Sequence, residues 1–173
     1  MRNRTDYLTR AKRFIRMIEP YLRDGGLENK WKAEKAIQNF NRRYSRKVMV
    51  AAGLTRIVFI SSDYVVKVDY GCENIWFGGC ENEVSVYEKA KKDGYDYLFA
   101  PITRYEYGGQ NWYIMPRIGG IGRYEYNAFS FLTWEECEWV EAHIGDLHEY
   151  NYGWRNNRPV IFDYAMEVRE EDE

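Results

Sequence analysis

Cysteine, histidine and proline are scarce in this sequence. Its 173 residues include three cysteines, two histidines and four prolines. An odd number of cysteines without paired Cys-x-x-Cys spacing indicates neither a disulfide framework nor a zinc site. The two histidines, His143 and His148, complete no familiar set of metal ligands with the cysteines. The composition therefore predicts a protein of a reducing compartment, the cytoplasm.

Long apolar runs are also missing. The longest uninterrupted one, Val48–Leu54, is far shorter than the roughly 20 residues that span a bilayer. The first residues, Met1–Asp6, contain no apolar segment of the kind that a secretion signal needs, so we expect no membrane partner. With 45% hydrophobic and 17% aromatic residues the chain still has ample apolar surface to fold, and its length suits one domain or one two-lobed domain.

Net charge is small, but its distribution is uneven. The formal net charge is -2, from 25 Lys+Arg and 27 Asp+Glu. Residues 1–50 hold 14 of the basic and 5 of the acidic residues, whereas residues 51–173 hold 11 basic and 22 acidic ones. A basic N-terminal segment is therefore joined to an acidic body.

Hydrophobic periodicity predicts two helices at the start of the chain. The first ends at Gly25 and carries apolar residues on one side and Lys or Arg on the other. The second covers about residues 28–43. We expect its buried face to contain Trp31, Ile37, Phe40 and Tyr44.

The remaining sequence alternates short β-branched runs with two further helices. Such runs, joined by short turns, are typical of antiparallel strands. Thr133 and Glu136 have the spacing of a capping box at the start of the last helix. The pattern predicts an α+β protein with a five-stranded antiparallel sheet. Its expected strands are 48–50, 56–60, 64–68, 102–107 and 112–118, a later strand pair is expected at 153–154 and 159–163, and the helices are expected at 81–92 and 134–144.

The strongest local pattern lies near the C-terminus. Asp146 is followed five residues later by Asn151, and Asp163 ends an apolar strand. Phosphoryl transfer needs one carboxylate beside the attacking hydroxyl, and oxygen ligands for the magnesium ions that bridge the nucleotide phosphates. A short loop and a strand end can supply these groups. Taken alone, the Asp-to-Asn spacing is equally typical of a surface turn.

A lysine inside an apolar strand is the second candidate feature. Lys67 lies within Tyr64–Val68, where an unpaired charge is costly unless it faces a cleft and a partner. Glu83, on the next expected helix, is a natural partner. Taken alone, the two residues are better explained as an edge-strand lysine and a glutamate on a helix surface.

Six segments that carry these features follow one another in a fixed order. They are a turn at 53–59, the strand segment 65–67, Glu83, the strand 112–118, the loop 145–151, and 163–165 at the end of the last strand. This order resembles the protein-kinase-like superfamily, including its aminoglycoside phosphotransferase branch, and looks most like the very small kinase-like proteins of bacteriophages.

The resemblance implies a truncated protein-kinase-like fold. A basic helical extension would occupy residues 1–46, a kinase-like N-lobe 47–118, and a minimal C-lobe 119–173. In that fold residues 81–92 would form helix C beside the five-stranded sheet. If the source is a virus, the host cytoplasm is the expected location.

The resemblance also implies ATP as the nucleotide. The turn that contains Gly53, Thr55 and Arg56 would take the place of the glycine-rich loop over the phosphates. Met115 would stand at the gatekeeper position. Ile118 would offer backbone groups to adenine.

The remaining roles follow from the same resemblance. Lys67, held by Glu83, would contact the α- and β-phosphates of the nucleotide. Asp146 would orient the substrate hydroxyl or accept its proton, and Asn151 and Asp163 would hold Mg²⁺. The predicted activity is an ATP- and magnesium-dependent phosphotransferase, with protein hydroxyl groups as the favoured acceptor.

Several departures from the family pattern leave alternatives open. Gly53 is the only glycine in the nucleotide-covering turn, and Ala165 replaces a glycine that normally gives backbone freedom. Ten residues follow Asp163, so we expect no activation segment and no large second-lobe helices. The chain could complete its second lobe with a partner or a second copy, act on a small molecule, or be a pseudokinase-like protein that binds a host factor without catalysis.

The basic N-terminal segment supports a further alternative, nucleic-acid binding. Its lysine and arginine density could neutralise several phosphates. The same residues alternate with a continuous apolar face that needs a partner surface. We therefore favour packing of these helices against the acidic body over a nucleic-acid site.

Overall fold

The computed structural model describes residues 4–25, 30–44, 49–52, 56–69, 79–119, 130–145 and 147–164. These residues belong to two compact units. Unit 1 comprises residues 1–75 and 103–117, and unit 2 comprises 76–102 and 118–173. The chain therefore leaves unit 1, builds part of unit 2, and returns to finish the unit 1 sheet.

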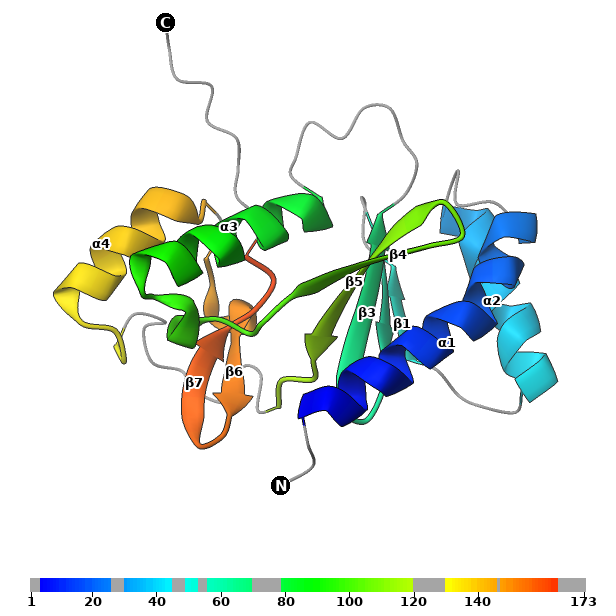
Figure 1. Ribbon diagram of the computed structural model, residues 1–173, viewed down its shortest axis with the longest axis horizontal. Coiled ribbons are helices and arrows are strands. Elements are labelled where there is room, and N and C mark those ends of the chain that lie inside the picture. The colour runs from blue at the N-terminus through cyan, green and yellow to red at the C-terminus, as the bar shows by residue number, and fades with distance from the viewer. Residues whose placement is uncertain are drawn as a thin grey trace, which may run out of the picture. The chain divides into compact units, whose positions relative to one another are not determined.

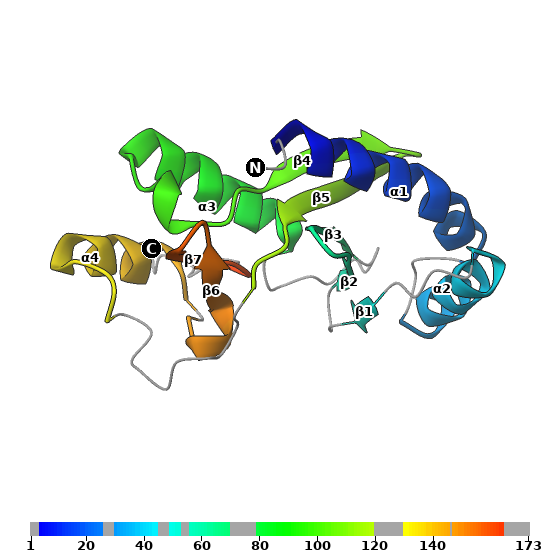
Figure 2. The ribbon, with the colours of Figure 1, turned by 90° about the horizontal axis from the view of Figure 1, so that it is seen from below.

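Two helices and a five-stranded sheet form unit 1 (Figures 1 and 2). The helices are α1 (Arg4–Gly25) and α2 (Lys30–Tyr44), and the strands are β1 (Met49–Ala52), β2 (Arg56–Ile60), β3 (Tyr64–Asp69), β4 (Thr103–Tyr107) and β5 (Gln110–Pro116). All strand pairs are antiparallel, in the order β1-β2-β3-β5-β4. This confirms the predicted α+β class and its five-stranded antiparallel sheet.

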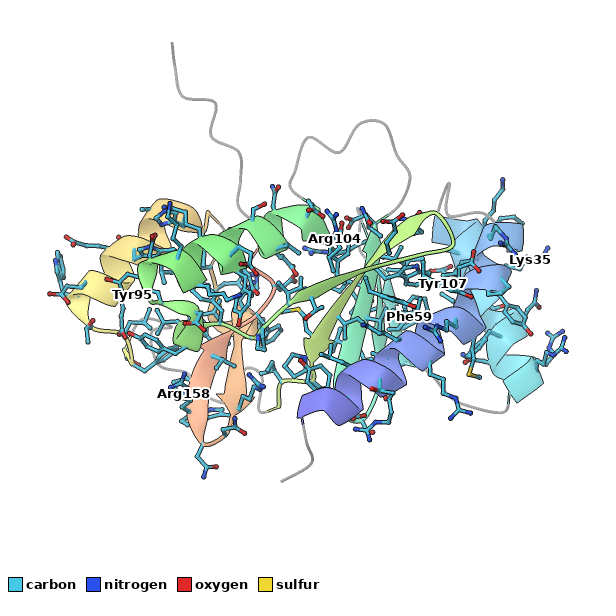
Figure 3. The ribbon with its side chains drawn as sticks, in the orientation of Figure 1. Lys35, Phe59, Tyr95, Arg104, Tyr107 and Arg158 are labelled. Atoms are coloured by element: carbon cyan, nitrogen blue, oxygen red, sulfur yellow. The ribbon has the colours of Figure 1, made fainter. Side chains whose placement is uncertain are left out.

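One face of this sheet is covered by α1, which packs on β3, β4 and β5 and is itself packed against α2. The helices form here because their apolar residues recur every three or four positions and so share one face. Phe59 points from the sheet toward α1 (Figure 3), and its ring lies 5.4 Å from that of Phe14. The fully buried side chains at this interface include Ile15, Ile18, Leu22, Phe40, Ile57, Phe59, Trp112 and Ile114.

The prediction for α2 is wrong at Trp31. Ile37 and Phe40 are buried as expected, but the Trp31 side chain is 68% exposed. At about 100° per residue, Trp31 lies about 180° around the helix from Phe40, so both cannot face the same core. The side chain of Tyr44, also predicted to be buried, lies outside the described residues.

Unit 2 contains shorter elements. They are α3 (Cys80–Asp93), the 3-10 turn η1 (Asp96–Leu98), α4 (Trp134–His143), the 3-10 turn η2 (Glu149–Asn151), and the hairpin β6 (Tyr152–Arg155) and β7 (Arg158–Ile161). Thr133 and Glu136 form the predicted capping box, in which the Glu136 amide donates to Thr133 Oγ1 at 3.3 Å. Asn156 and Asn157 take positive φ angles of 53° and 63° in the hairpin turn, which asparagine tolerates better than most residues.

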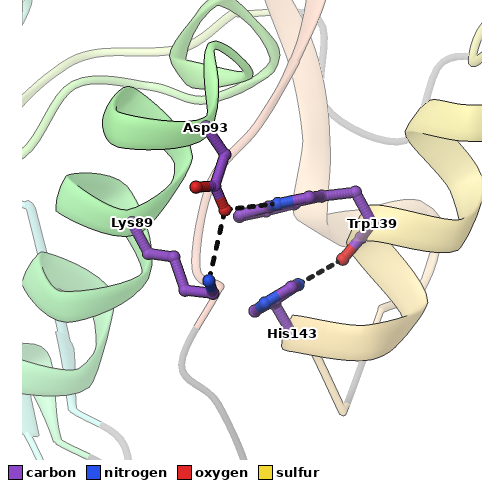
Figure 4. A network of polar contacts seen from close by, with 4 residues as sticks. All are labelled: Lys89, Asp93, Trp139 and His143. Carbon is purple, nitrogen blue, oxygen red and sulfur yellow. Dashed lines mark hydrogen bonds and ion pairs between the residues drawn. The ribbon is translucent and has the colours of Figure 1, made fainter.

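Polar contacts between aromatic and charged side chains join the helices of unit 2. Trp139 on α4 donates from Nε1 to the Asp93 carboxylate at 3.0 Å, and Lys89 lies 3.2 Å from the same oxygen (Figure 4). The His143 ring stacks on Trp139 with a centroid separation of 4.2 Å. The hydrogen bond from Trp139 and the nearby Lys89 lower the pKa of Asp93. None of the described helices is long and apolar enough to cross a membrane.

Candidate functional site

Lys67 lies on β3, in the middle of the unit 1 sheet. Its cross-strand neighbours are Val58 on β2 and Tyr113 on β5. Directly opposed residues share a face of the sheet, so Lys67 is on the face opposite to the one that α1 covers. Lys67 is only 4% exposed and interacts with at least one other group. The structure thus excludes the reading of Lys67 as an edge-strand lysine in solvent.

Glu83 lies in the first turn of α3, within unit 2, and is fully buried. A buried carboxylate is costly unless it is paired or hydrogen-bonded, and Glu83 is not without a partner. Burial is the main cause that raises the pKa of Tyr164 well above its usual value, and the charge of Glu83 adds to the shift. Glu83 is therefore not a helix-surface glutamate. Its pairing with Lys67 stays a prediction.

Asn151 ends the η2 turn and is 4% exposed. His148 caps this turn, since its Nδ1 accepts from the Tyr150 amide at 3.2 Å. The His148 amide lies 3.4 Å from Asn151 Oδ1, and the Asn151 amide donates to the His148 carbonyl at 2.9 Å. The first bond holds the Asn151 side chain and the second holds its backbone, so Asn151 is not a loose surface-turn residue.

Asn151 also holds the segment that follows β7. Its Nδ2 donates to the Asp163 carbonyl oxygen at 2.7 Å, and its own carbonyl accepts from the Phe162 amide at 2.8 Å. Asp163 has a φ of 59°, in the left-handed region that few residues other than glycine adopt. The Asp163 residue is exposed. Two predicted magnesium ligands are thus brought onto adjacent, hydrogen-bonded segments.

Tyr164 anchors this strand end in the core of unit 2. The side chain is fully buried, and its hydroxyl donates to the Ala100 carbonyl at 2.8 Å. Its ring meets Phe99 edge to face at 4.9 Å. With Asn151 on one side and Tyr164 on the other, Asp163 has little freedom in its backbone position.

The predicted nucleotide-binding residues are only partly described. Met115 on β5 and Ile118 are buried, at 2% and 6% exposed, and Arg56 is half-buried opposite Asp69. In unit 2, Gly153 faces Ile118, and a Cβ at Gly153 would collide with the Ile118 side chain. The Ile118 side chain is therefore packed inside unit 2, and a role for its backbone in base binding stays a prediction. Gly53, Thr55 and Asp146 lie outside the described residues.

The donor set can be compared with the needs of a magnesium ion. Mg²⁺ prefers carboxylate and amide oxygens, and Asp163 and Asn151 provide one of each. Asn151 Oδ1 already accepts one long hydrogen bond and retains a second lone pair. Among the described residues no group of three His, Cys, Asp or Glu could hold a metal. The pair therefore fits a metal that takes its other ligands from phosphate and water.

Several important contacts of this region had no signal in the sequence. The tie from Tyr164 to Ala100 joins residues that are far apart in the chain, and the capping role of His148 depends on the local backbone conformation of the η2 turn. Tyr97 is a further example, since its hydroxyl donates to Glu136 at 2.5 Å. That hydrogen bond, with burial, raises the pKa of Tyr97 to about 12. The sequence identified Lys67, Glu83, the Asp-to-Asn spacing and the strand-end aspartate as candidates, but none of these three contacts.

Comparison with known proteins adds no argument to this geometry. No protein-family model and no curated protein sequence matches this chain.

Proposed function

We propose that the chain is an ATP- and magnesium-dependent phosphotransferase of a truncated protein-kinase-like fold. The observation that carries this proposal is the hydrogen bond from the Asn151 side chain to the Asp163 carbonyl. Asp163 is exposed, and its backbone is in the left-handed region. Strained backbone that the surroundings hold in place is often found at functional sites. A buried lysine in the central strand of an antiparallel sheet, Lys67, gives independent support.

The proposed chemistry assigns a separate task to each residue. Lys67 neutralises charge on the nucleotide phosphates, and Asp146 orients the substrate hydroxyl and takes up its proton. Asn151 and Asp163 hold magnesium, which when bound supplies charge neutralisation at the transferring phosphoryl group. Glu83 positions Lys67. Protein hydroxyl groups are the proposed acceptor.

Phosphate transfer from labelled ATP tests the assignment. The wild-type protein with Mg²⁺ should label itself or proteins of a cell lysate, and Asp163→Asn and Lys67→Met should reduce labelling by roughly 10²- to 10³-fold each. Asp146→Ala should have a comparable effect. Glu141→Gln, which changes an exposed carboxylate on α4, is the matched control and should label like the wild type.

Thermal unfolding separates nucleotide binding from catalysis. ATP with Mg²⁺ at a hundred times its dissociation constant should add about 2.7 kcal/mol of apparent stability to the wild type. Equal labelling by wild type and all three variants would contradict phosphoryl transfer. Stabilisation by ATP without any transfer would instead favour a pseudokinase-like interaction protein.

A further inference from the structure

The outer face of α2 carries a stripe of aromatic, cationic and amide side chains. Trp31, Lys35, Gln38 and Arg42 are all exposed. With about 100° per residue, the four lie within about 60° of arc, opposite the buried residues Ala33, Ala36, Ile37 and Phe40. Figure 3 shows Lys35 on the side of α2 that faces away from the sheet. We call these four residues the α2 stripe.

The α2 stripe is not needed to pack unit 1. The apolar side of α2 is already satisfied, since Phe40 is 1% exposed and meets Phe14 and Tyr21 edge to face. The apolar face of α2 thus packs against α1. The basic residues on the other side of α2 therefore face outward. The need of the apolar face for a partner surface no longer argues against ligand binding by these residues.

Positive charge exceeds negative charge on this helix. Helix α2 contains five Lys or Arg residues and one acidic residue, Glu34. No acidic side chain in the described part of the chain pairs with Arg42 or Arg43. A helix with this charge attracts a polyanion.

Trp31 adds a recognition element that charge alone would not need. The Lys35 ammonium lies 5.3 Å from the centroid of its indole ring, so the cation covers one ring face. With 68% of the residue exposed, much of the indole is accessible to a ligand. A flat ring held in place by a neighbouring cation is suited to stacking on a nucleobase.

We propose that the α2 stripe binds single-stranded nucleic acid. Lys35 and Arg42 contact phosphates two helical turns apart, about 10 Å along the helix axis, and Trp31 stacks on a base between or beside them. Gln38 donates to a base edge or a phosphate. An acidic protein would satisfy the cations but does not carry a planar group beside each negative charge, as a nucleotide does, and a duplex keeps its bases stacked on one another. The site is separate from the proposed phosphotransferase residues.

Fluorescence anisotropy with a labelled 20-nucleotide oligo-dT and a matching oligo-U, without ATP, tests the site on the full chain. Trp31→Ala should weaken binding of both by about 5- to 20-fold, and Trp31→Phe should weaken it less than threefold, because phenylalanine still stacks. The double variant Lys35→Gln/Arg42→Gln should flatten the slope of log Kd against log salt by about 1.4, since each phosphate contact accounts for about 0.7. Circular dichroism verifies that each variant is folded.

The matched control is Trp134→Ala, which removes the 77% exposed indole at the start of the acidic helix α4 and should leave oligonucleotide affinity unchanged. If Trp31→Ala weakens the binding of oligo-U more than that of oligo-dT, the ligand within this proposal is RNA. Three results would overturn it: Trp31→Ala and Trp134→Ala with equal affinities, tighter binding to a duplex of the same length, or binding of poly-glutamate that Trp31→Ala weakens just as much.

Discussion

The two units of this protein are stabilised in different ways. Unit 1 buries a continuous set of large apolar side chains between one sheet face and two amphipathic helices. Unit 2 joins short elements by hydrogen bonds from side chains to distant backbone groups, as Tyr164 does to Ala100, Asn151 to Asp163 and Arg158 to Tyr97. Hydrophobic contacts are non-directional and tolerate change, whereas such hydrogen bonds fix atoms in position.

This contrast indicates where chemistry can be placed. An apolar interface of regular elements gives stability, and a network of directed bonds gives the position of an individual carboxylate or amide. The Asn151–Asp163 tie belongs to the second kind. Substitutions in unit 1 should therefore reduce overall stability, while those in unit 2 should change local geometry or titration at a smaller thermodynamic cost.

The largest effect is expected from Phe40→Ala in unit 1. The substitution removes a 1% exposed ring that meets two other aromatic rings, and should lower the free energy of unfolding by about 3–5 kcal/mol. Urea denaturation followed by circular dichroism measures the change. Gln38→Ala, on the exposed side of the same helix, should change it by less than about 0.5 kcal/mol. A Phe40→Ala loss as small as the control would mean that α2 is not part of the unit 1 core.

A smaller loss is expected from Tyr164→Phe in unit 2. The change keeps the ring against Phe99 but leaves the Ala100 carbonyl without its donor. We expect a loss of about 1–3 kcal/mol, the cost of an unsatisfied buried acceptor. Hydrogen exchange should show the loss as faster exchange at residues around 100 and 161, which pair through the Ala100 amide. Unchanged protection there would contradict an anchoring role for the hydroxyl.

Tyr152→Phe should have the opposite sign. Its hydroxyl is buried with no hydrogen-bond partner, and burial raises the pKa of this phenol well above its usual value. Removing an unsatisfied polar group should increase the free energy of unfolding by up to about 1 kcal/mol. Chemical denaturation beside Tyr164→Phe provides the comparison. Equal losses in both variants would show that the two hydroxyls have equivalent surroundings.

The smallest effect concerns the titration of Asp93. The hydrogen bond from Trp139 is the main cause that lowers the pKa of Asp93, so Trp139→Phe should raise that pKa toward its ordinary value. Because the folded-state pKa is below the unfolded one, the stabilisation is present above the unfolded pKa and is lost as pH falls through the folded pKa. In Trp139→Phe the stabilisation should be smaller, and its loss should be complete at a higher pH. NMR titration of the Asp93 carboxyl measures the shift, and Lys89→Gln should raise the pKa less.

The regular parts of the fold could be predicted because their signals are local. Residue period identified the helices and the five strands, and the Thr133 capping box was read from two residues. The error at Trp31 has a physical cause, since an aromatic residue was assigned to the core by its hydrophobicity rather than by its angle on the helix.

The candidate site could be predicted only in part. Its residue types are local, and the sequence identified Lys67, Asn151 and Asp163 as candidates. The bond from Asn151 to the Asp163 backbone and the left-handed conformation of Asp163 depend on how η2 and β7 pack, which no spacing reveals. The burial of Glu83 was likewise not visible, because the same helix pattern fits an exposed glutamate.

The order of strands in the unit 1 sheet has a consequence for synthesis of the chain. β5 lies between β3 and β4, although it is made after β3, α3 and β4. While a ribosome extends the chain, β3 must therefore wait as an edge strand until β5 emerges. Exposed edges invite pairing with other chains, and charged side chains on them discourage it. Lys67 and Asp69, on the sheet face away from α1, would thus protect the nascent protein from aggregation before the sheet is complete.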